Sequence, residues 1–311
     1  MKKILCICLS STLQRTIDFE ELTLAQVNRS KKYRQDASGK AINSARVLNQ
    51  LEKGCAVCIC PLGEKNQQYF LDLAAQDDLE IRSVTIPGFT RECWTLLDKA
   101  RGTTTELVVS EPALEIKAES GEKPAEIKLL KMINEAFSTV DAVLLAGSRP
   151  AIWRTDLYAT IAGMAKDAGK LFLADYISAD MEKTLESAIP DIIKINEEEF
   201  IATFMKKRNK GDSPRCSSDD LKTAISEKSK ELKNIIIVTR GAESTFAAKN
   251  GEFTECPCEK VNAVNTTACG DSFNAGFIYE YINTNDFKSA LKKGTWCAAR
   301  NAELEVPGGI K

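Results

Sequence analysis

The stretch Asn265-Thr266-Thr267-Ala268-Cys269-Gly270-Asp271-Ser272-Phe273 is the most informative part of this chain, because small residues open a predicted helix there. A carboxylate, Asp271, lies in the first turn of that helix. Backbone N–H groups at a helix start lack intrahelical partners and carry roughly half a positive charge, so they can bind a migrating phosphoryl group. Asp271 could then take a proton from an attacking hydroxyl group. The alternative is that Asp271 only complements the helix dipole, which is the favoured interpretation of an isolated Asp at a helix start.

The composition is that of an ordinary globular protein. The 311 residues are 43% hydrophobic and 28% charged, which is enough for one large core. A net charge of −2, with no Lys/Arg run backed by aromatic residues, argues against a nucleic-acid-binding surface. No segment approaches the roughly 20 apolar residues of a membrane-spanning helix, and the apolar run at residues 4–9 is too short for a signal peptide. We therefore expect a cytoplasmic protein.

The chain contains eleven cysteines and no histidine. Six cysteines lie in apolar, strand-like runs where a thiol behaves as a small hydrophobe, namely Cys6, Cys8, Cys55, Cys58, Cys60 and Cys93. A zinc-thiolate site is disfavoured because there is no histidine and no pair of Cys-x-x-Cys units. Without histidine, Ser-His-Asp and Cys-His catalysis are excluded, and a carboxylate becomes the leading candidate for a general base.

Short apolar runs alternate with segments of helical period, which predicts an α/β fold. The predicted strands are residues 4–9, 55–60, 141–146, 171–175, 191–195 and 235–239, and the predicted helices are residues 40–52, 126–138, 155–168, 219–232 and 269–283. Such alternation implies a mainly parallel sheet with helices on both faces and ligands at the carboxyl ends of the strands. The stretches at about 12–35 and 85–112 lack helical period and predict a small β-sheet lid over that edge. We expect a single domain over residues 1–311, with the lid inserted in it.

Lys40 lies in the first turn of a predicted helix, in the run Ser38-Gly39-Lys40-Ala41-Ile42-Asn43. A cation at this position opposes the helix dipole by roughly 0.3–1 kcal/mol unless a negative charge lies beside it. Lys40 and the helix start could therefore hold an anion together. The alternative is a long lysine that extends into solvent.

Two further strand ends carry polar residues. Asn196 and Glu199 have the spacing of a capping box, in which each side chain bonds the other residue's backbone N–H. The same acidic corner could also hold Mg²⁺ through water beside a polyphosphate. Thr239-Arg240-Gly241 offers backbone and hydroxyl donors at a neighbouring strand end, although by itself it is only a turn.

In their order and spacing, these segments resemble the phosphofructokinase B (PfkB) family of sugar kinases, which has a three-layer ribokinase-like fold. The resemblance covers nearly the whole chain. The runs at residues 27–29, 38–43, 45–48 and 90–91 are similar to the branch that contains 1-phosphofructokinase and tagatose-6-phosphate kinase. The resemblance implies transfer of the γ-phosphoryl group of ATP to a hydroxyl group of a ketohexose phosphate, with Mg²⁺ as the cofactor.

The resemblance also implies roles for individual residues. The family's Gly-Ala-Gly-Asp falls on Ala268-Cys269-Gly270-Asp271, so Asp271 would be the catalytic base and the N–H groups of the turn would form an anion hole. The implied sugar-phosphate-binding residues are Gly39, Lys40, Asn43, Arg91 and, from the lid, Arg29. The implied nucleotide-binding residues are Asn196, Thr239, Gly241 and Gly270, with Glu199 holding Mg²⁺ through water.

The chain departs from the family pattern at three places, one of which is the family's Gly-Gly-Lys-Gly, here Ser38-Gly39-Lys40-Ala41. The family's aspartate that grips sugar hydroxyls is replaced by Gln14, which can still form hydrogen bonds but has no charge. Ala268 and Cys269 occupy the first two positions of the glycine-rich turn. Because an added Cβ is costly where φ is positive, we expect Ala268 not to be strongly left-handed.

These departures leave two alternatives open. Gln14 favours a kinase of the same fold that acts on an unphosphorylated sugar or a nucleoside. The altered turn favours a sugar-phosphate-binding protein with impaired catalysis. We also expect that an exposed edge of the lid could pair two subunits into a homodimer.

Overall fold

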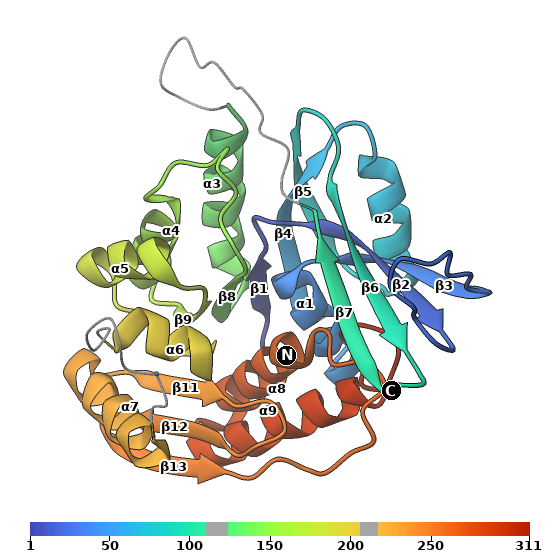
Figure 1. Cartoon of the computed structure of the whole chain (residues 1–311). Coiled ribbons are helices and arrows are strands. Elements are labelled where there is room, and N and C mark those ends of the chain that lie inside the picture. Colours follow the sequence, from blue (N-terminus) through green and yellow to red (C-terminus); the bar gives the residue numbers. More distant parts are fainter. Residues whose placement is uncertain (110–123, 206–216) are drawn as a thin grey trace.

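The computed structural model describes residues 1–109, 124–205 and 217–311, in which a large twisted sheet lies between two layers of helices (Figure 1). The sheet has the strand order β13-β12-β11-β10-β9-β8-β1-β4-β5. Its strands are β1 Ile4–Ile7, β4 Ala56–Gly63, β5 Ile81–Ile86, β8 Ala142–Ala146, β9 Leu171–Asp175, β10 Ile192–Asn196, β11 Ile235–Thr239, β12 Thr245–Lys249 and β13 Glu252–Cys256. Seven neighbouring strands of this sheet run parallel, namely β11, β10, β9, β8, β1, β4 and β5. By contrast, β12 is antiparallel to both of its neighbours. The predicted α/β class, with a mainly parallel sheet, is confirmed.

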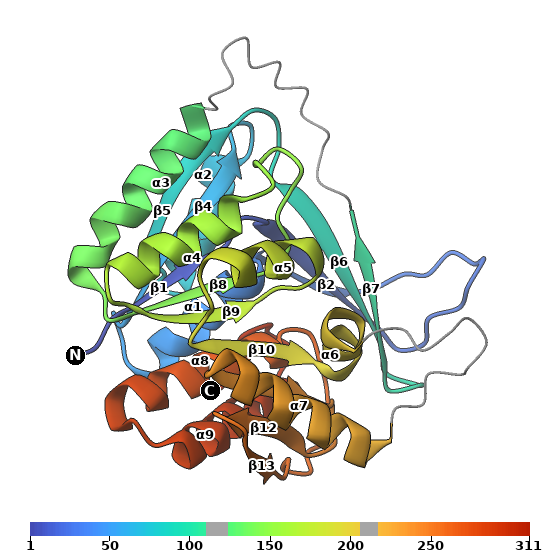
Figure 2. The ribbon, with the colours of Figure 1, turned by 90° about the vertical axis from the view of Figure 1, so that its left-hand side faces the viewer.

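Each face of the sheet has its own hydrophobic core. In β1, Ile4 and Cys6 pack into one core, while Leu5 and Ile7 pack into the other, as the two-residue period of a strand requires. The first core is covered by α1 Lys40–Leu51, α2 Gln67–Gln76, α8 Cys269–Thr284 and α9 Phe287–Ala302. The second is covered by α3 Pro124–Ala136, α4 Leu157–Asp167, α5 Ser178–Ser187, α6 Glu197–Phe204 and α7 Ser218–Leu232, with the short 3-10 helix η1 Phe137–Thr139 after α3 (Figure 2).

The cysteines that were expected to be buried are buried and free, including Cys55 and Cys93. Helices α2, α5 and α9, by contrast, lie outside the predicted helical ranges. In α5 only Met181 and Thr184 are buried, and in α2 only Phe70, Leu73 and Ala74, so neither helix has a long apolar stripe. Within the described residues, no helix is both long enough and apolar enough to cross a membrane.

A second, smaller sheet stands beside the carboxyl ends of the parallel strands (Figure 1). It consists of β2 Thr12–Phe19, β3 Lys32–Ser38, β6 Arg91–Asp98 and β7 Thr103–Val108, in the order β3-β2-β6-β7. The hairpins β2-β3 and β6-β7 are antiparallel, and a parallel pairing of β2 with β6 joins them. The two segments predicted to form a lid therefore meet in one sheet, although residues 110–112 of the predicted range lie outside the described residues.

Candidate functional site

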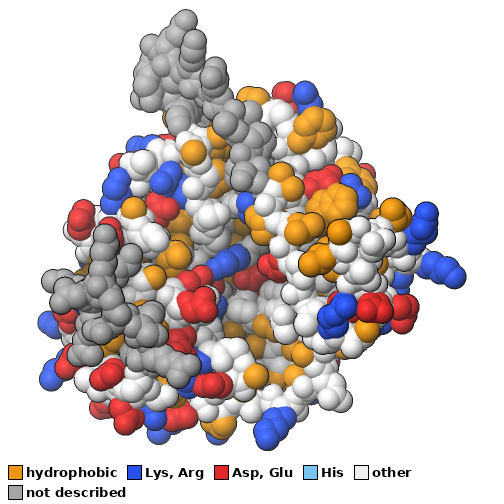
Figure 3. All heavy atoms as spheres, viewed as in Figure 1, with side chains coloured by type: hydrophobic (Ala, Val, Ile, Leu, Met, Phe, Trp, Pro, Cys, Tyr) orange, Lys and Arg blue, Asp and Glu red, His pale blue; other side chains and the backbone are white. Residues whose placement is uncertain are grey.

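A cavity of about 890 Å³ lies between the carboxyl edge of the large sheet and the small sheet. Figure 3 shows charged side chains of both signs gathered around this hollow. All of the predicted site residues except Arg29 line it, namely Gln14, Gly39, Lys40, Asn43, Arg91, Asn196, Glu199, Thr239, Gly241, Ala268, Cys269, Gly270 and Asp271. Arg29 lies in the exposed loop between β2 and β3, outside this lining, and its role stays a prediction.

The predicted helix start is present, because α8 begins at Cys269 and faces the cavity. The expectation for Ala268 was wrong: this residue precedes the helix with φ +67°, in the left-handed region. That conformation costs an L-residue about 1–2 kcal/mol. The turn is held in place from outside, since Asn301 Nδ2 donates to the carbonyl of Thr267 at 2.8 Å. The N–H of Cys269 donates to the carbonyl of Thr266, and no side chain of the described residues caps the helix. The N–H groups of Gly270 and Asp271 therefore lack side-chain partners, and both residues line the cavity.

Asp271 is buried at the bottom of the cavity, with 6% of its surface exposed. Asn43 Nδ2 donates to its Oδ2 at 2.9 Å, and the Ser44 hydroxyl donates to its backbone carbonyl at 2.8 Å, so α1 clamps the first turn of α8. Burial raises the pKa of Asp271 to about 6, against the opposing effects of Lys40 and the Asn43 hydrogen bond. The carboxylate is therefore ionised at neutral pH and close to the range in which a general base works well.

Lys40 does not extend freely into solvent. Its ammonium lies 3.0 Å from Asp175 Oδ1, at the end of β9, and 3.9 Å from Glu199 Oε1. Asp175 raises the pKa of Lys40 above its ordinary value. These carboxylates supply the negative charge that a cation at a helix start requires.

Lys194 and Asn274 complete a charged cluster that the sequence analysis missed. Lys194 Nζ lies 3.1 Å from Asp175 Oδ2, and Asn274 Nδ2 donates to the same oxygen at 2.6 Å. Although burial alone would raise the pKa of Asp175, Lys194 and Lys40 hold it well below its usual range. A charged residue inside the otherwise apolar strand Ile192–Asn196 was the available signal, because a lysine is rarely buried without a partner.

Gly270 allows Lys194 to approach the start of α8. A Cβ at Gly270 would lie only 2.8 Å from Lys194 Nζ, so a side chain there would displace the ammonium. Lys194, like Gly270, lines the cavity. The helix start and a buried cation thus provide positive charge at one place, beside Asp271.

The predicted capping box at the end of β10 is present. Asn196 Oδ1 accepts from the N–H of Glu199, and Glu199 Oε2 accepts from the N–H of Asn196, both at 2.8 Å. Beside it, Thr239 and Gly241 form the turn after β11, in which Gly241 has φ +60°. No group of three or more Cys, Asp or Glu side chains that could hold a metal occurs in the described part of the chain.

The small sheet reaches the turn before α8 directly. The Thr267 hydroxyl donates to Glu106 Oε1 of β7 at 2.8 Å. Gln14, on β2, donates from Nε2 to the Thr95 hydroxyl of β6 at 2.8 Å, so its amide nitrogen is engaged within the small sheet. Glu106 was not predicted as a site residue, because its position depends on how the two hairpins pair.

Comparisons with known proteins agree with this architecture. The chain is 28% identical over 310 residues to a tagatose-6-phosphate kinase from Staphylococcus epidermidis, and the match covers 99% of this chain and 94% of that protein. A "Possible 1-phosphofructokinase" from Thermotoga maritima superimposes with a TM-score of 0.84 at 19% identity, over 98% of this chain and 93% of that one. Escherichia coli phosphofructokinase-2 in complex with fructose-6-phosphate gives a TM-score of 0.81 at 16% identity, over 97% of this chain and 94% of that one. These two structures share the fold.

The family resemblance inferred from the motifs is confirmed over nearly the whole chain. The sequence matches the profile described as "pfkB family carbohydrate kinase" across residues 2–305, a range that includes every residue of the cavity described above. The chain therefore belongs to the pfkB family of carbohydrate kinases, enzymes that phosphorylate a sugar.

Proposed function

We propose that this kinase transfers the γ-phosphoryl group of ATP to a hydroxyl group of a ketohexose phosphate. The observation that carries the proposal is a buried carboxylate, Asp271, in the first turn of α8 within a cavity that Lys40, Arg91 and Lys194 also line. A sugar phosphate and a nucleotide bring several negative charges together, and cations are needed to bind them. The relative named tagatose-6-phosphate kinase supports a phosphorylated acceptor.

In this proposal each side of the cavity has its own task. Asp271 accepts the proton of the attacking hydroxyl group, an effect worth about 10²–10⁴ in rate. The N–H groups at residues 268–271 and the Lys194 ammonium neutralise charge on the transferred group. Lys40 and Arg91 hold the phosphate that the acceptor already carries. Holding the two substrates in line supplies much of the remaining acceleration.

The nucleotide and Mg²⁺ would occupy the side of the cavity lined by Asn196, Thr239 and Gly241. Mg²⁺ neutralises charge on the nucleotide phosphates when it is bound. The Glu199 carboxylate already has protein partners, because it accepts from the N–H of Asn196 and lies near Lys40. A contact with the ion through water, and not a direct one, fits this arrangement. This fits an ion bound mainly by phosphates and water, as Mg²⁺ often is.

The competing proposal is an unphosphorylated acceptor, favoured by Gln14, which replaces a carboxylate with an amide bonded to Thr95. A panel of sugar phosphates, free sugars and nucleosides with ATP and Mg²⁺, read by ADP release, separates the two. Arg91→Ala should raise the KM for a phosphosugar about tenfold or more but hardly change that for a neutral acceptor. Tight binding of a sugar phosphate in calorimetry with no ADP formed would instead identify a binding protein.

We also propose that two copies associate through the outer face of the small sheet. Tyr33 is 68% exposed, Leu107 49% and Trp94 37%, and Trp94 pairs directly with Leu107 across β6 and β7. Figure 3 shows hydrophobic side chains gathered over part of this sheet. Exposed apolar patches of this kind mark interaction sites. Sedimentation should show a dimer that Leu107→Asp dissociates, and a monomeric unaltered chain would overturn this part.

A further inference from the structure

We infer that Arg46 is a positioning residue for the base, acting on Asp271 through Asn43 from outside the cavity lining. The inference rests on the proposed function, in which Asp271 takes the proton of the acceptor. The buried face of α1 would then contribute to the reaction as well as to the hydrophobic core.

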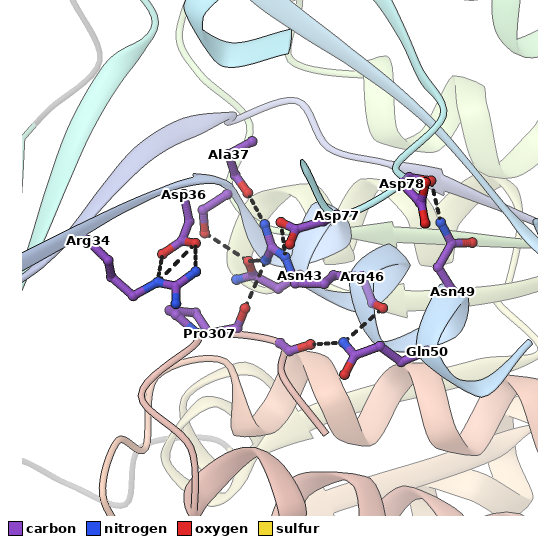
Figure 4. A network of polar contacts seen from close by, with 12 residues as sticks. Arg34, Asp36, Ala37, Asn43, Arg46, Asn49, Gln50, Asp77, Asp78 and Pro307 are labelled. Carbon is purple, nitrogen blue, oxygen red and sulfur yellow. Dashed lines mark hydrogen bonds and ion pairs between the residues drawn. The ribbon is translucent and has the colours of Figure 1, made fainter. Parts of the chain in front are cut away.

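The guanidinium group of Arg46 is buried and held on every side (Figure 4). Nε donates to Asp77 Oδ2 at 2.8 Å, and Nη1 donates to the carbonyl of Pro307 at 2.8 Å. Nη2 donates to the carbonyl of Ala37, at the end of β3. Nη1 also donates to Asn43 Oδ1 at 3.1 Å. Because partners on separate segments fix its plane, the guanidinium presents a rigid donor to Asn43.

Arg46 determines which end of the Asn43 amide faces the base. A guanidinium group has donors only, so the atom of Asn43 that faces it must be the carbonyl oxygen. The Ser38 hydroxyl donates to the same oxygen at 2.8 Å. The amide nitrogen is thereby directed at Asp271 Oδ2, 2.9 Å away. A reversed amide would set its oxygen against the carboxylate and its nitrogen against the guanidinium, which are two repulsive contacts.

This orientation matters for the protonation of the base. A donor to a carboxylate favours the ionised form and lowers the pKa. Other charged or titratable groups also face Asp271: Lys40 of α1, Asp175 of β9, Lys194 of β10, Cys8 after β1 and Cys269 of α8. None of these groups has a hydrogen bond with Arg46 among the described residues. Loss of Arg46 should therefore remove one specific donor and leave the surrounding charges in place.

The test is the pH dependence of kcat/KM in the variant Arg46→Lys. Lysine keeps the positive charge beside Asp77 but lacks the planar fork that also reaches Asn43. We expect the acid limb of the pH profile to move upward by about one pH unit, the equivalent of one hydrogen bond to a charged group. Such a shift from about pH 6 lowers kcat/KM about twofold at pH 7 and about tenfold at pH 5. The KM for ATP should stay unchanged, since the nucleotide-facing residues are not touched.

Gln50→Ala is the matched control. Gln50 lies one turn further along α1, where Nε2 donates to the carbonyl of Gly308 at 2.7 Å and Oε1 accepts from the N–H of Ile310 at 2.8 Å. It tethers the same carboxyl-terminal segment as Arg46 (Figure 4) but does not contact Asn43. Its acid limb should match that of the unaltered enzyme. An equal shift in Gln50→Ala would show that Arg46 acts only through folding, and the inference would be overturned.

Two further variants make the result decisive. If Arg46→Lys does not fold, Ser38→Ala removes the other donor to Asn43 Oδ1 and should move the acid limb in the same direction by less; an unmoved limb overturns the inference. Asp271→Asn, measured alongside, separates the two proposals. Full activity in Asp271→Asn refutes the proposed base. If Asp271→Asn loses activity but the acid limb of the pH profile is unmoved in Arg46→Lys, only the positioning role of Arg46 is refuted.

Discussion

The two helices that begin at the cavity, α1 and α8, both follow a residue at positive φ but carry opposite charges in their first turns. Each is preceded by a residue at positive φ with no side-chain cap, Gly39 at +132° and Ala268 at +67°. The first turn of α1 carries the cation Lys40, whereas that of α8 carries Asp271. A lone helix start would favour the acid and disfavour the lysine.

The tertiary surroundings change both preferences. Asp175 and Glu199 supply the charge that makes Lys40 acceptable at the start of α1. At the start of α8, burial raises the pKa of Asp271 and turns a dipole-matched carboxylate into a candidate base. The chemistry of a helix start therefore depends on the groups packed against it as well as on its own dipole.

The largest expected effect is at the acidic start. Asp271→Asn should lower kcat by about 10²–10⁴ while sugar-phosphate binding persists, because the amide keeps the shape but cannot take a proton. ADP release and calorimetry measure the two quantities. Asp286→Asn is the control, since Asp286 caps α9 by accepting from the N–H groups of Lys288 and Ser289. If the two variants behave alike, Asp271 is only a dipole partner.

The preceding residues should respond differently to a Cβ. At Gly39 a Cβ would lie 2.6 Å from Cys8 Sγ and 3.1 Å from the carbonyl of Ser10, in addition to the strain of φ +132°. We expect Gly39→Ala to lower the free energy of unfolding by about 2–4 kcal/mol. Urea unfolding measures this loss. An unchanged midpoint would mean that the start of α1 tolerates a side chain as α8 does.

The acid limb of the pH profile should report the α8 start. With its pKa raised to about 6, Asp271 gains a proton as the pH falls through that value and can no longer act as a base. We expect kcat/KM to fall about tenfold per pH unit below it. An acid limb near pH 4 would instead indicate an ordinary, hydrated carboxylate.

The smallest effect concerns the strain at Ala268. Ala268→Gly removes a Cβ from a left-handed position, which should raise the free energy of unfolding by up to about 1 kcal/mol after the greater chain entropy of glycine is subtracted. Ala25→Gly is the control, because Ala25 has φ +60° in an exposed loop and does not line the cavity. If both variants gain the same stability and only Ala268→Gly changes kcat, the conformation of the turn before α8 matters for catalysis.

Local sequence patterns alone predict the α/β class, most of the parallel strands, the capping box at Asn196 and Glu199, and the helix start at Ala268–Asp271. These features depend on local patterns, namely side-chain periodicity and the spacing of caps, that can be read within a few residues. Helices with few buried positions, such as α5, gave too weak a periodicity to be predicted.

What those residues can do depends on contacts that form only in the folded chain. The hydrogen bond from Asn43 to Asp271 joins positions 228 residues apart, and that from Arg46 to Pro307 joins positions 261 apart. The pairing of Lys194 with Asp175, the raised pKa of Asp271 and the positive φ of Ala268 likewise follow from burial and long-range packing. Proton affinity and backbone strain depend on the whole environment of a group, and local sequence cannot specify that environment.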